Sequence, residues 1–423
     1  MVAVLAGAFG QETPRAGTNF TLTVRAEKAQ AIYQRGKEVR FKVRLLRAQE
    51  PVQEAVVEWT LSQDGVPPIR QGQLSLVNGE GTVTGKLEEP GFLQCRAVFK
   101  PPGGNAIIAL GGAGVDPLEI KPSLPIPEDF DTFWKAQKRK LAGVPMNPRL
   151  TAVEPRADGL ESFDLQADCV GAPVSGYYCR PAGAKPKSLP AYLSVHGAGV
   201  RSSDLGAAVA WAKEGFLALD INAHGIPNGR AAAYYNELAS GELKDYRTRG
   251  RESRETVYFL GMFLRLVRAI DFLAAQPEWD GRTLVVRGSS QGGAQAIAAA
   301  GLDSRVTFFA AGVPALCDHS GPVAGRVCGW PKLVPMAADG RPEAAILEVA
   351  RYYDAVNFAA RAKAPAIFTV GFIDTTCPPS SVYAAYNALQ SPKTIYNDVL
   401  SKHENTPGAL AAMREAILRH AGK

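Results

Sequence analysis

The sequence has few cysteines for its length. Six cysteines in 423 residues are too few for a disulfide scaffold, and none of their spacings resembles a zinc site. A metal centre is therefore not expected. Two pairs are left open as bridges, which export would favour: Cys169 with Cys179, across a predicted hairpin turn, and Cys317 with Cys328, around a short loop.

The sequence also lacks long apolar runs, internal repeats and a strong excess of one charge. No segment is long and apolar enough to span a membrane. The 47 basic and 41 acidic residues give a net charge of only +6, and the basic cluster at 135–140 is typical of the exposed face of an amphipathic helix. We therefore expect no nucleic acid and no membrane as partner, and a globular chain long enough for two domains.

The first 17 residues are apolar and then polar. This pattern is similar to the tail of a secretory signal, although the basic start and a full apolar region are missing. A start codon assigned too late would explain the pattern, and a disordered N-terminus is the alternative. We expect a secreted or periplasmic protein, with a cytoplasmic one as the alternative.

Residues 18–115 alternate apolar and polar side chains in short runs separated by turn residues. Period two with frequent turns predicts an all-β sandwich, and the length suits one immunoglobulin-like domain. The proline-rich stretch 116–127 is predicted to be a linker. Such a module could bind sugar, form a homo-oligomer or support the remaining chain, and the sequence leaves these roles open.

Residues 128–423 change to alternating strands and helices, which is typical of an α/β protein with a doubly wound, mostly parallel sheet. Predicted strands lie near 191–195, 216–221, 283–287, 307–313, 366–371 and 394–399, and predicted helices include 207–214, 252–275 and 381–389. In such sheets the catalytic groups gather at the carboxyl ends of the strands.

The motif Gly288-x-Ser290-x-Gly292 follows the predicted strand at 283–287 and precedes a small-residue helix. A bare G-x-S-x-G is weak evidence, because roughly one chain in five of this glycine content would contain it by chance. The strand before it and the helix after it match the nucleophile elbow of α/β-hydrolases, in which a sharp turn exposes a serine hydroxyl. Ser290 is therefore the candidate nucleophile.

An acid and then a histidine follow, in the order that α/β-hydrolases use. Asp374 leaves the predicted strand at 366–371, and His403 lies in a polar loop before the C-terminal helix. A serine hydroxyl needs a neutral imidazole to take its proton and a carboxylate to orient that imidazole. The other candidates are less well placed: Asp354 and Asp398 as solvated or capping carboxylates, His420 as an exposed residue and His319 in a loop without a preceding strand.

Two further strand ends supply candidates for the site. The loop from His196 to Gly199 follows the strand at 191–195, where the second oxyanion donor is expected, so the backbone N–H groups of Gln291 and Ala198 are the candidate oxyanion hole. His224 follows the next strand and is predicted to bond the loops around the elbow, with substrate contact as the alternative. Residues 230–246 carry Tyr234 and Tyr235, which could form a sugar-binding rim or an ordinary packed loop.

The chain from about Pro122 onward resembles the acetyl xylan esterase and cephalosporin C deacetylase family, carbohydrate esterase family 7. The segments that carry the resemblance are 127–134, 267–273, 288–293, 313–318, 374–380, 383–387 and 403–404. The resemblance implies a serine esterase that removes acetyl groups from xylan, xylo-oligosaccharides or related sugars through an acetyl-enzyme, without metal or cofactor. It assigns Ser290, Asp374 and His403 to the triad, and Gln291 and Ala198 to the oxyanion hole.

The chain departs from this family's pattern at two places. The family's Arg-Gly-Gln signature is here Asn222-Ala223-His224, and Ala198 stands where the family has a tyrosine in the oxyanion loop. These changes leave the substrate and the quaternary structure open. The alternatives are another α/β-hydrolase, such as a short-chain carboxylesterase or a peptidase, and a non-catalytic carbohydrate-binding protein.

Overall fold

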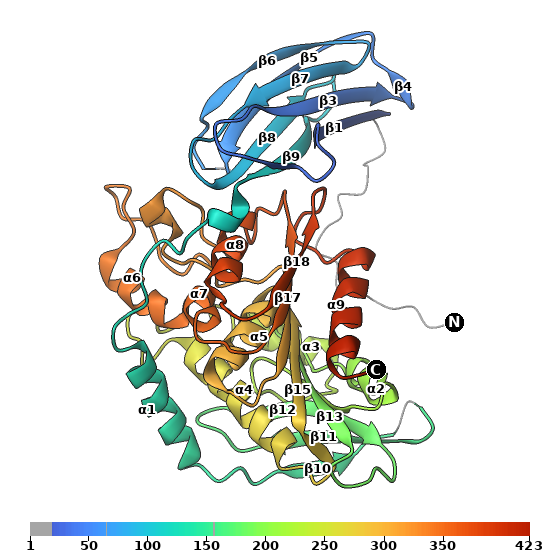
Figure 1. Ribbon diagram of the computed structural model, residues 1–423, viewed down its shortest axis with the longest axis vertical. Coiled ribbons are helices and arrows are strands. Elements are labelled where there is room, and N and C mark those ends of the chain that lie inside the picture. The colour runs from blue at the N-terminus through green and yellow to red at the C-terminus, as the bar shows by residue number, and fades with distance from the viewer. Residues whose placement is uncertain (1–18, 65, 155–156) are drawn as a thin grey trace.

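The computed structural model describes residues 19–64, 66–154 and 157–423. The predicted signal remnant at residues 1–17 lies outside these ranges. Figure 1 shows a β-sheet structure at one end of the molecule and a larger α/β structure below it. Within the described ranges, no helix has the length and apolarity needed to cross a bilayer.

The N-terminal part is a sheet whose strands alternate buried and exposed side chains. In β3 the buried side chains are Val39, Phe41, Val43 and Leu45, with exposed residues between them, which confirms the predicted period of two. The strands are β1 (Phe20–Ala26), β2 (Ile32–Tyr33), β3 (Val39–Arg47), β4 (Glu50–Pro51), β5 (Glu54–Gln63), β6 (Arg70–Val77), β7 (Glu80–Gly85), β8 (Gly91–Phe99) and β9 (Ile107–Val115).

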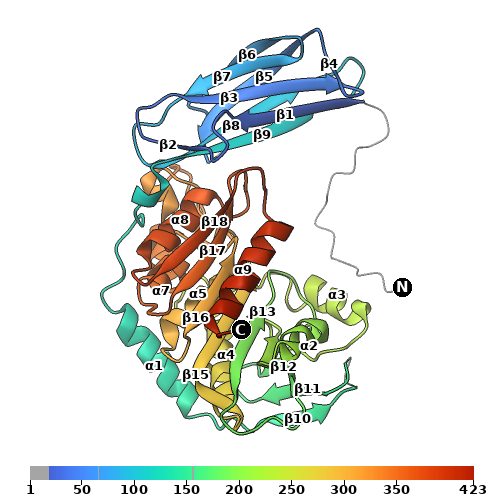
Figure 2. The ribbon, with the colours of Figure 1, turned by 45° about the vertical axis from the view of Figure 1, so that its right-hand side comes forward.

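Hydrogen bonds join these strands into one sheet with the order β1-β3-β7-β6-β5-β8-β9-β2, and β4 pairs with β3. The sheet curls, so that β9 also lies against β1: a Cβ added at Gly111 would be 2.7 Å from a methyl group of Val24. Figure 2 shows the resulting two layers. The immunoglobulin-like assignment stays a prediction, because pairing runs continuously through both layers.

The proline-rich segment after β9 is fastened to the α/β part along its length. It contains a short 3-10 helix, Pro117–Glu119. The side-chain amide of Asn387 donates to the carbonyls of Pro117 and Ile120 at 2.9 and 2.8 Å, and Ser123 bonds the Asp318 carboxylate. The segment predicted as a linker is therefore packed rather than free.

The second sheet has the order β10-β11-β12-β14-β13-β15-β16-β17-β18. Its pairs from β14 through β13 to β18 are parallel and the pairs from β10 to β14 are antiparallel, which confirms a mostly parallel sheet. The strands are β10 (Arg149–Ala152), β11 (Leu160–Ala167), β12 (Val174–Pro181), β13 (Leu189–Val195), β14 (Leu217–Ile221), β15 (Trp279–Ser289), β16 (Phe308–Gly312), β17 (Ala366–Gly371) and β18 (Lys393–Asp398).

Helices cover both faces of this sheet, so the fold is doubly wound. One face packs against α2 and α9 in a cluster that includes Val209 and Met413, and the other packs against α4, α5 and α8, with α7 lying on α5 and α8. Figure 1 shows the two groups on opposite sides. The helices are α1 (Phe130–Ala142), α2 (Leu205–Lys213), α3 (Ala232–Ser240), α4 (Tyr258–Ala274), α5 (Gln291–Leu302), α6 (Ala344–Ala350), α7 (Ala355–Ala359), α8 (Pro379–Ala388) and α9 (Pro407–His420).

One local expectation is wrong, and one open alternative is decided. The helix predicted over 252–275 begins only at Tyr258, because residues 253–256 form turns in which the Thr256 hydroxyl donates to the Gly250 and Ser253 carbonyls. All six cysteines are free and buried, so the structure has neither of the two bridges that the sequence left open. The register of β11 and β12 places Ser162, not Cys169, opposite Cys179.

Candidate active site

Ser290 lies on the sharp turn between β15 and α5. Its backbone has φ 57° and ψ −123°, which an L-residue adopts only when the surrounding structure holds it there. The turn is tight enough to require glycine on both sides of the serine. A Cβ on Gly288 would lie 2.2 Å from the Gly292 carbonyl oxygen, and a Cβ on Gly292 would lie 2.4 Å from the Val195 carbonyl oxygen. The predicted elbow residues thus form a strained strand-to-helix turn.

The structure brings Ser290, His403 and Asp374 into one hydrogen-bonded line. His403 Nε2 lies 2.8 Å from Ser290 Oγ, and His403 Nδ1 lies 2.7 Å from Asp374 Oδ2. The residues follow β15, β18 and β17, whose carboxyl ends meet at the same edge of the sheet because the strands are parallel. Asp374 is buried, whereas Ser290 and His403 are partly exposed, so a substrate can reach the hydroxyl.

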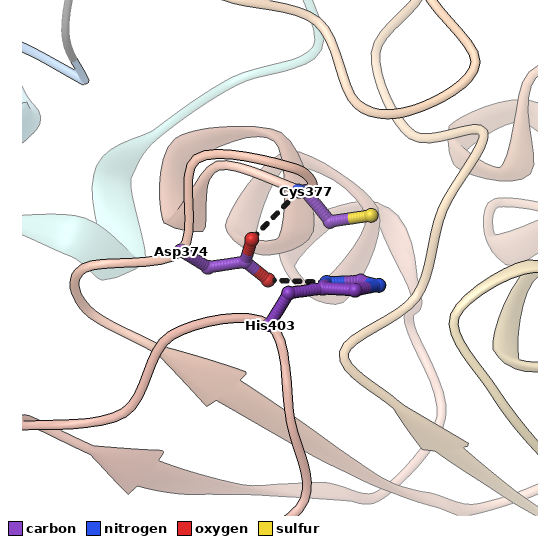
Figure 3. A group of neighbouring side chains, drawn as sticks. All are labelled: Asp374, Cys377 and His403. Atoms are coloured by element: carbon purple, nitrogen blue, oxygen red, sulfur yellow. Dashed lines mark hydrogen bonds and ion pairs between the residues drawn. The ribbon is translucent and has the colours of Figure 1, made fainter. Parts of the chain in front are cut away.

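The Asp374 carboxylate is fixed at both oxygens. Its Oδ1 accepts the backbone N–H groups of Thr376 and Cys377 at 2.8 and 2.9 Å, which leaves Oδ2 for His403 (Figure 3). With Oδ1 engaged by the backbone, Oδ2 is held facing Nδ1, where a carboxylate accepts the Nδ1 proton of a neutral imidazole. The geometry therefore selects the tautomer that leaves Nε2 free to accept the Ser290 proton.

Asp374, Cys377 and His403 are also the described residues that come close enough to share a metal ion, with candidate ligand atoms within 4.8 Å of one another. Their donor atoms fit such an ion poorly. Burial raises the pKa of the Cys377 thiol well above its ordinary value, which disfavours the thiolate that would bind a metal. Both Asp374 oxygens already accept protein hydrogen bonds. Asp374 and His403 instead form the hydrogen-bonded line with Ser290, and Cys377 donates its backbone N–H to Asp374.

The loop after β13 lies directly against the elbow. A Cβ on Gly197 would be 3.5 Å from the Ser290 Cβ. Gln291 opens α5, so its backbone N–H belongs to the first helical turn and has no partner within the helix. Ala198 N–H has no partner among the described residues either, whereas the neighbouring Gly199 N–H donates to the Tyr246 hydroxyl at 3.3 Å. Both predicted oxyanion donors thus lie on segments next to Ser290, and neither N–H group has another partner among the described residues.

His224 bonds the loops around the elbow and is itself buried. Its ring nitrogens lie 2.8 Å from the Tyr258 hydroxyl and 3.1 Å from the Gly199 carbonyl oxygen. Burial lowers the pKa of His224 to about 4, so the ring is neutral near pH 7. Because protein groups occupy both ring nitrogens, this placement matches the structural role predicted for His224.

The tyrosine that reaches the elbow is Tyr246, which the sequence did not single out. Its hydroxyl donates to the Gln291 side-chain oxygen at 2.9 Å and accepts from Gly199 N–H, so one oxygen joins the two segments that flank Ser290. The His224 ring packs edge-on against it, with ring centres 4.7 Å apart. Tyr246 is the last residue of the segment 230–246, where an isolated tyrosine gave no signal of this contact.

Tyr234 and Tyr235 lie on α3, and their rings contact one another edge-to-face. The Tyr235 hydroxyl is buried; it donates to the Pro227 carbonyl at 2.9 Å and accepts from Arg230 N–H at 3.1 Å. Tyr235 therefore supports its own loop. Tyr234 is half-buried, and its contact with substrate stays a prediction.

The lower-ranked candidates Asp354, Asp398 and His420 make structural contacts away from Ser290. Asp354 caps α7 and also accepts from the backbone of Asp318 and His319, which matches its predicted capping role. Asp398 accepts from the Thr406 hydroxyl at the start of α9. The expectation that His420 is exposed is wrong, because it is half-buried and lies 2.9 Å from the Thr307 hydroxyl.

His319 should make stability depend on pH. It is fully buried, its ring nitrogens have no partner among the described residues, and burial lowers its pKa from 6.5 to about 4. Below about pH 6.5 the unfolded chain binds a proton at His319 that the native chain does not, so stability falls as pH falls. His319→Leu lacks this proton-binding group, so its unfolding free energy should not show this fall. The difference in unfolding free energy, His319→Leu minus wild type, should therefore be about 2 kcal/mol larger at pH 5 than at pH 8.

Urea unfolding of both proteins at the two pH values measures this difference. A substitution effect that is equal at pH 5 and pH 8 would contradict the neutral, unpartnered state of His319.

Comparison with known proteins identifies the family of this chain. A family model described as acetyl xylan esterase (AXE1) matches residues 117–420. The chain belongs to the acetyl xylan esterase family. It is accordingly a carboxylic ester hydrolase with the α/β-hydrolase fold. The match begins after the N-terminal sheet, at the segment that fastens that sheet to the α/β part.

Three similar proteins are 25–29% identical to this chain. The acetyl esterase Axe7A of Xylanibacter ruminicola is 29% identical over 408 residues, which is 95% of this chain and 91% of that protein. The acetyl xylan esterase of Paenibacillus sp. R4 is 28% identical with a TM-score of 0.62, covering 72% of this chain and 98% of that one. Acetyl xylan esterase 1 of Thermoanaerobacterium sp. JW/SL YS485 is 25% identical with a TM-score of 0.59, covering 72% and 97%.

Proposed function

We propose that this protein is a serine esterase that removes acetyl groups from acetylated xylan, xylo-oligosaccharides or related sugars. The observation that carries the proposal is the line from Ser290 Oγ through His403 to Asp374, at 2.8 and 2.7 Å, on a strained elbow. We infer an acetyl group as the acyl part of the substrate, and a sugar hydroxyl as the alcohol part, from membership of the acetyl xylan esterase family and from the names of the relatives.

The first half of the reaction forms an acetyl-enzyme. His403 Nε2 accepts the hydroxyl proton of Ser290 as Oγ attacks the ester carbonyl carbon, and Asp374 stabilises the imidazolium that results. The negative charge that develops on the carbonyl oxygen is met by the N–H groups of Gln291 and Ala198. When the tetrahedral intermediate collapses, the carbon–oxygen bond to the sugar breaks, and the sugar oxygen takes the proton from His403.

The second half releases acetate. Water enters at the place that the sugar left, and His403 accepts a proton from it as its oxygen attacks the acetyl carbonyl. Collapse of this second intermediate returns the proton to Ser290 Oγ. His403 carries every proton transfer in this sequence, and its two side-chain contacts, with Ser290 and Asp374, are within hydrogen-bond distance before substrate binds.

The test is a series of p-nitrophenyl esters with the Ser290→Ala protein as blank. The proposal expects acetate to be cleaved much faster than butyrate or octanoate, and acetylated xylo-oligosaccharides to release acetate. Faster turnover of the longer esters would indicate a short-chain carboxylesterase of broader specificity instead. If no ester is cleaved and a serine-directed phosphonate leaves Ser290 unlabelled, the proposed function is wrong.

Tyr246→Phe should lower kcat by about tenfold, because loss of the hydroxyl frees both segments that carry the oxyanion donors. Tyr235→Phe is the matched control, since it deletes a buried hydroxyl that also makes two hydrogen bonds, but on α3. It should cost stability and leave kcat nearly unchanged. Equal kcat in the two variants would contradict the role given to Tyr246.

A further inference from the structure

The N-terminal sheet touches the segment that carries the candidate acid. Gly112, on β9, lies so close to Phe372 that an added Cβ would be 2.3 Å from the Phe372 carbonyl oxygen and 2.8 Å from its carbonyl carbon. Phe372 precedes Asp374 by two residues in the loop after β17. Figures 1 and 2 both show β8 and β9 lying over the end of β17 and β18 and over α8. The contact joins backbone to backbone, without a flexible side chain between them.

Side chains extend this contact on both sides of Gly112. The ring of Phe92, on β8, packs against the ring of Phe372 at 4.9 Å between centres and against the ring of Tyr383 on α8 at 5.4 Å. Asp64, in the turn after β5, accepts a hydrogen bond from the Ser380 hydroxyl in the first turn of α8. All of these side chains are buried. The N-terminal sheet therefore contacts both ends of the loop between β17 and α8.

The other side of the same loop lies against the segment that carries His403. Phe372 N–H donates to the Asp398 carbonyl at 3.0 Å, and Ile373 N–H donates to the Ser401 carbonyl at 3.2 Å. A Cβ on Gly371 would lie 2.3 Å from the Lys402 carbonyl oxygen. Residues 371–374 are thus held between β9 and the histidine loop, and the loop cannot move toward either side without displacing backbone.

We propose that the N-terminal sheet is a working part of the active site: through Gly112 and Phe92 it holds the loop of Asp374 at the position where the carboxylate meets His403. Gly112 and Phe92 are positioning residues, because they act on Asp374 through Phe372 and touch no reacting atom. This inference rests on the proposed function for the role of Asp374. It also gives the N-terminal sheet the supporting role among those that the sequence left open.

The decisive experiment compares two neighbouring glycines of β9. Both have a backbone that alanine can adopt, and they point to opposite faces of the strand. A methyl group on Gly112 would strike the Phe372 backbone, whereas one on Gly111 would meet Val24 and Phe41 inside the N-terminal sheet. Gly111→Ala therefore strains the sheet without touching the acid loop, and is the matched control for Gly112→Ala.

Activity on p-nitrophenyl acetate is measured per active site, with sites counted by phosphonate labelling so that unfolded protein is excluded. Gly112→Ala should lower kcat by about tenfold to a hundredfold with little change in KM, since a displacement of about 1 Å can cost that much. Gly111→Ala should keep the wild-type kcat. If both variants keep the wild-type kcat, or if both lose kcat to the same extent, the proposal is overturned.

A second readout does not depend on catalysis. The amide protons of Thr376 and Cys377 bond Asp374 Oδ1, so their hydrogen exchange reports whether the acid loop keeps its geometry. Exchange at these two amides should be faster in Gly112→Ala than in Gly111→Ala. If wild type has no esterase activity but this difference is seen, the proposed function fails while the positioning stands. If wild type is an active esterase but exchange at these two amides is the same in Gly112→Ala and Gly111→Ala, the positioning proposal fails while the proposed function stands.

Phe92→Leu provides a milder test if Gly112→Ala does not fold. It keeps an apolar side chain at the contact but removes the ring that packs on Phe372 and Tyr383. Phe41→Leu, a buried ring of β3 in the same sheet, is its control. A lower kcat per titrated site in Phe92→Leu than in Phe41→Leu is expected, and equal values would contradict the proposal.

Discussion

Replacing Ser290 with alanine is expected to lower kcat/KM by about 100,000-fold, because the residual rate would come only from the oxyanion donors and substrate binding. The substitution removes the one hydroxyl that lies 2.8 Å from His403 Nε2. The fold should survive, since alanine needs no more room than serine. Initial rates on p-nitrophenyl acetate over wild-type and variant protein measure the loss.

Ser289→Ala is the matched control for this prediction. It makes the same change one residue earlier, where the hydroxyl accepts from the Asn405 side chain rather than facing His403. We expect its kcat/KM to stay within about tenfold of wild type. If Ser290→Ala retained more than about 1% of wild-type activity, another nucleophile would have to carry the reaction.

Asp374→Asn is expected to lower kcat by about 10,000-fold while preserving the structure of the loop. The asparagine Oδ1 can still accept the N–H groups of Thr376 and Cys377, so its Nδ2 must face His403. An amide nitrogen donates and cannot accept the Nδ1 proton. It therefore favours the tautomer with the proton on Nε2, and that tautomer cannot accept the proton of Ser290.

The control for Asp374→Asn is Asp354→Asn, which makes the same substitution at a buried carboxylate that caps α7. It should destabilise the protein and leave kcat per titrated site within about tenfold of wild type. Thermal unfolding and site titration separate the two effects. A large loss of kcat in Asp354→Asn, with none in Asp374→Asn, would reassign the acid.

The α/β part of the chain was predictable because its signals are local. Each strand of a buried parallel sheet is a short apolar run, so the run at 366–371 predicts β17 at the same bounds, and the runs at 191–195 and 394–399 lie within two residues of β13 and β18. The helix expected from 252 was placed too early, because local hydrogen bonds of Ser253 and Thr256 compete with helix formation.

The placement of the candidate site followed from strand ends. Since the carboxyl ends of parallel strands share one edge, residues that follow β13, β15, β17 and β18 had to meet there, although they are far apart in the sequence. Tyr246 could not be predicted from strand ends. It lies at the end of the segment 230–246, which is not a strand end, and its hydroxyl reaches Gln291 only through the path of the folded chain.

By itself, the sequence determined that the chain contains an elbow serine with an acid and a histidine after it on a mostly parallel sheet, because period, glycine spacing and chain order are properties of neighbouring residues. Only the tertiary structure decided which tyrosine joins the oxyanion segments and where the N-terminal sheet sits. Those outcomes depend on close packing between distant surfaces, such as Gly112 against Phe372, and such packing leaves no periodic trace in the sequence.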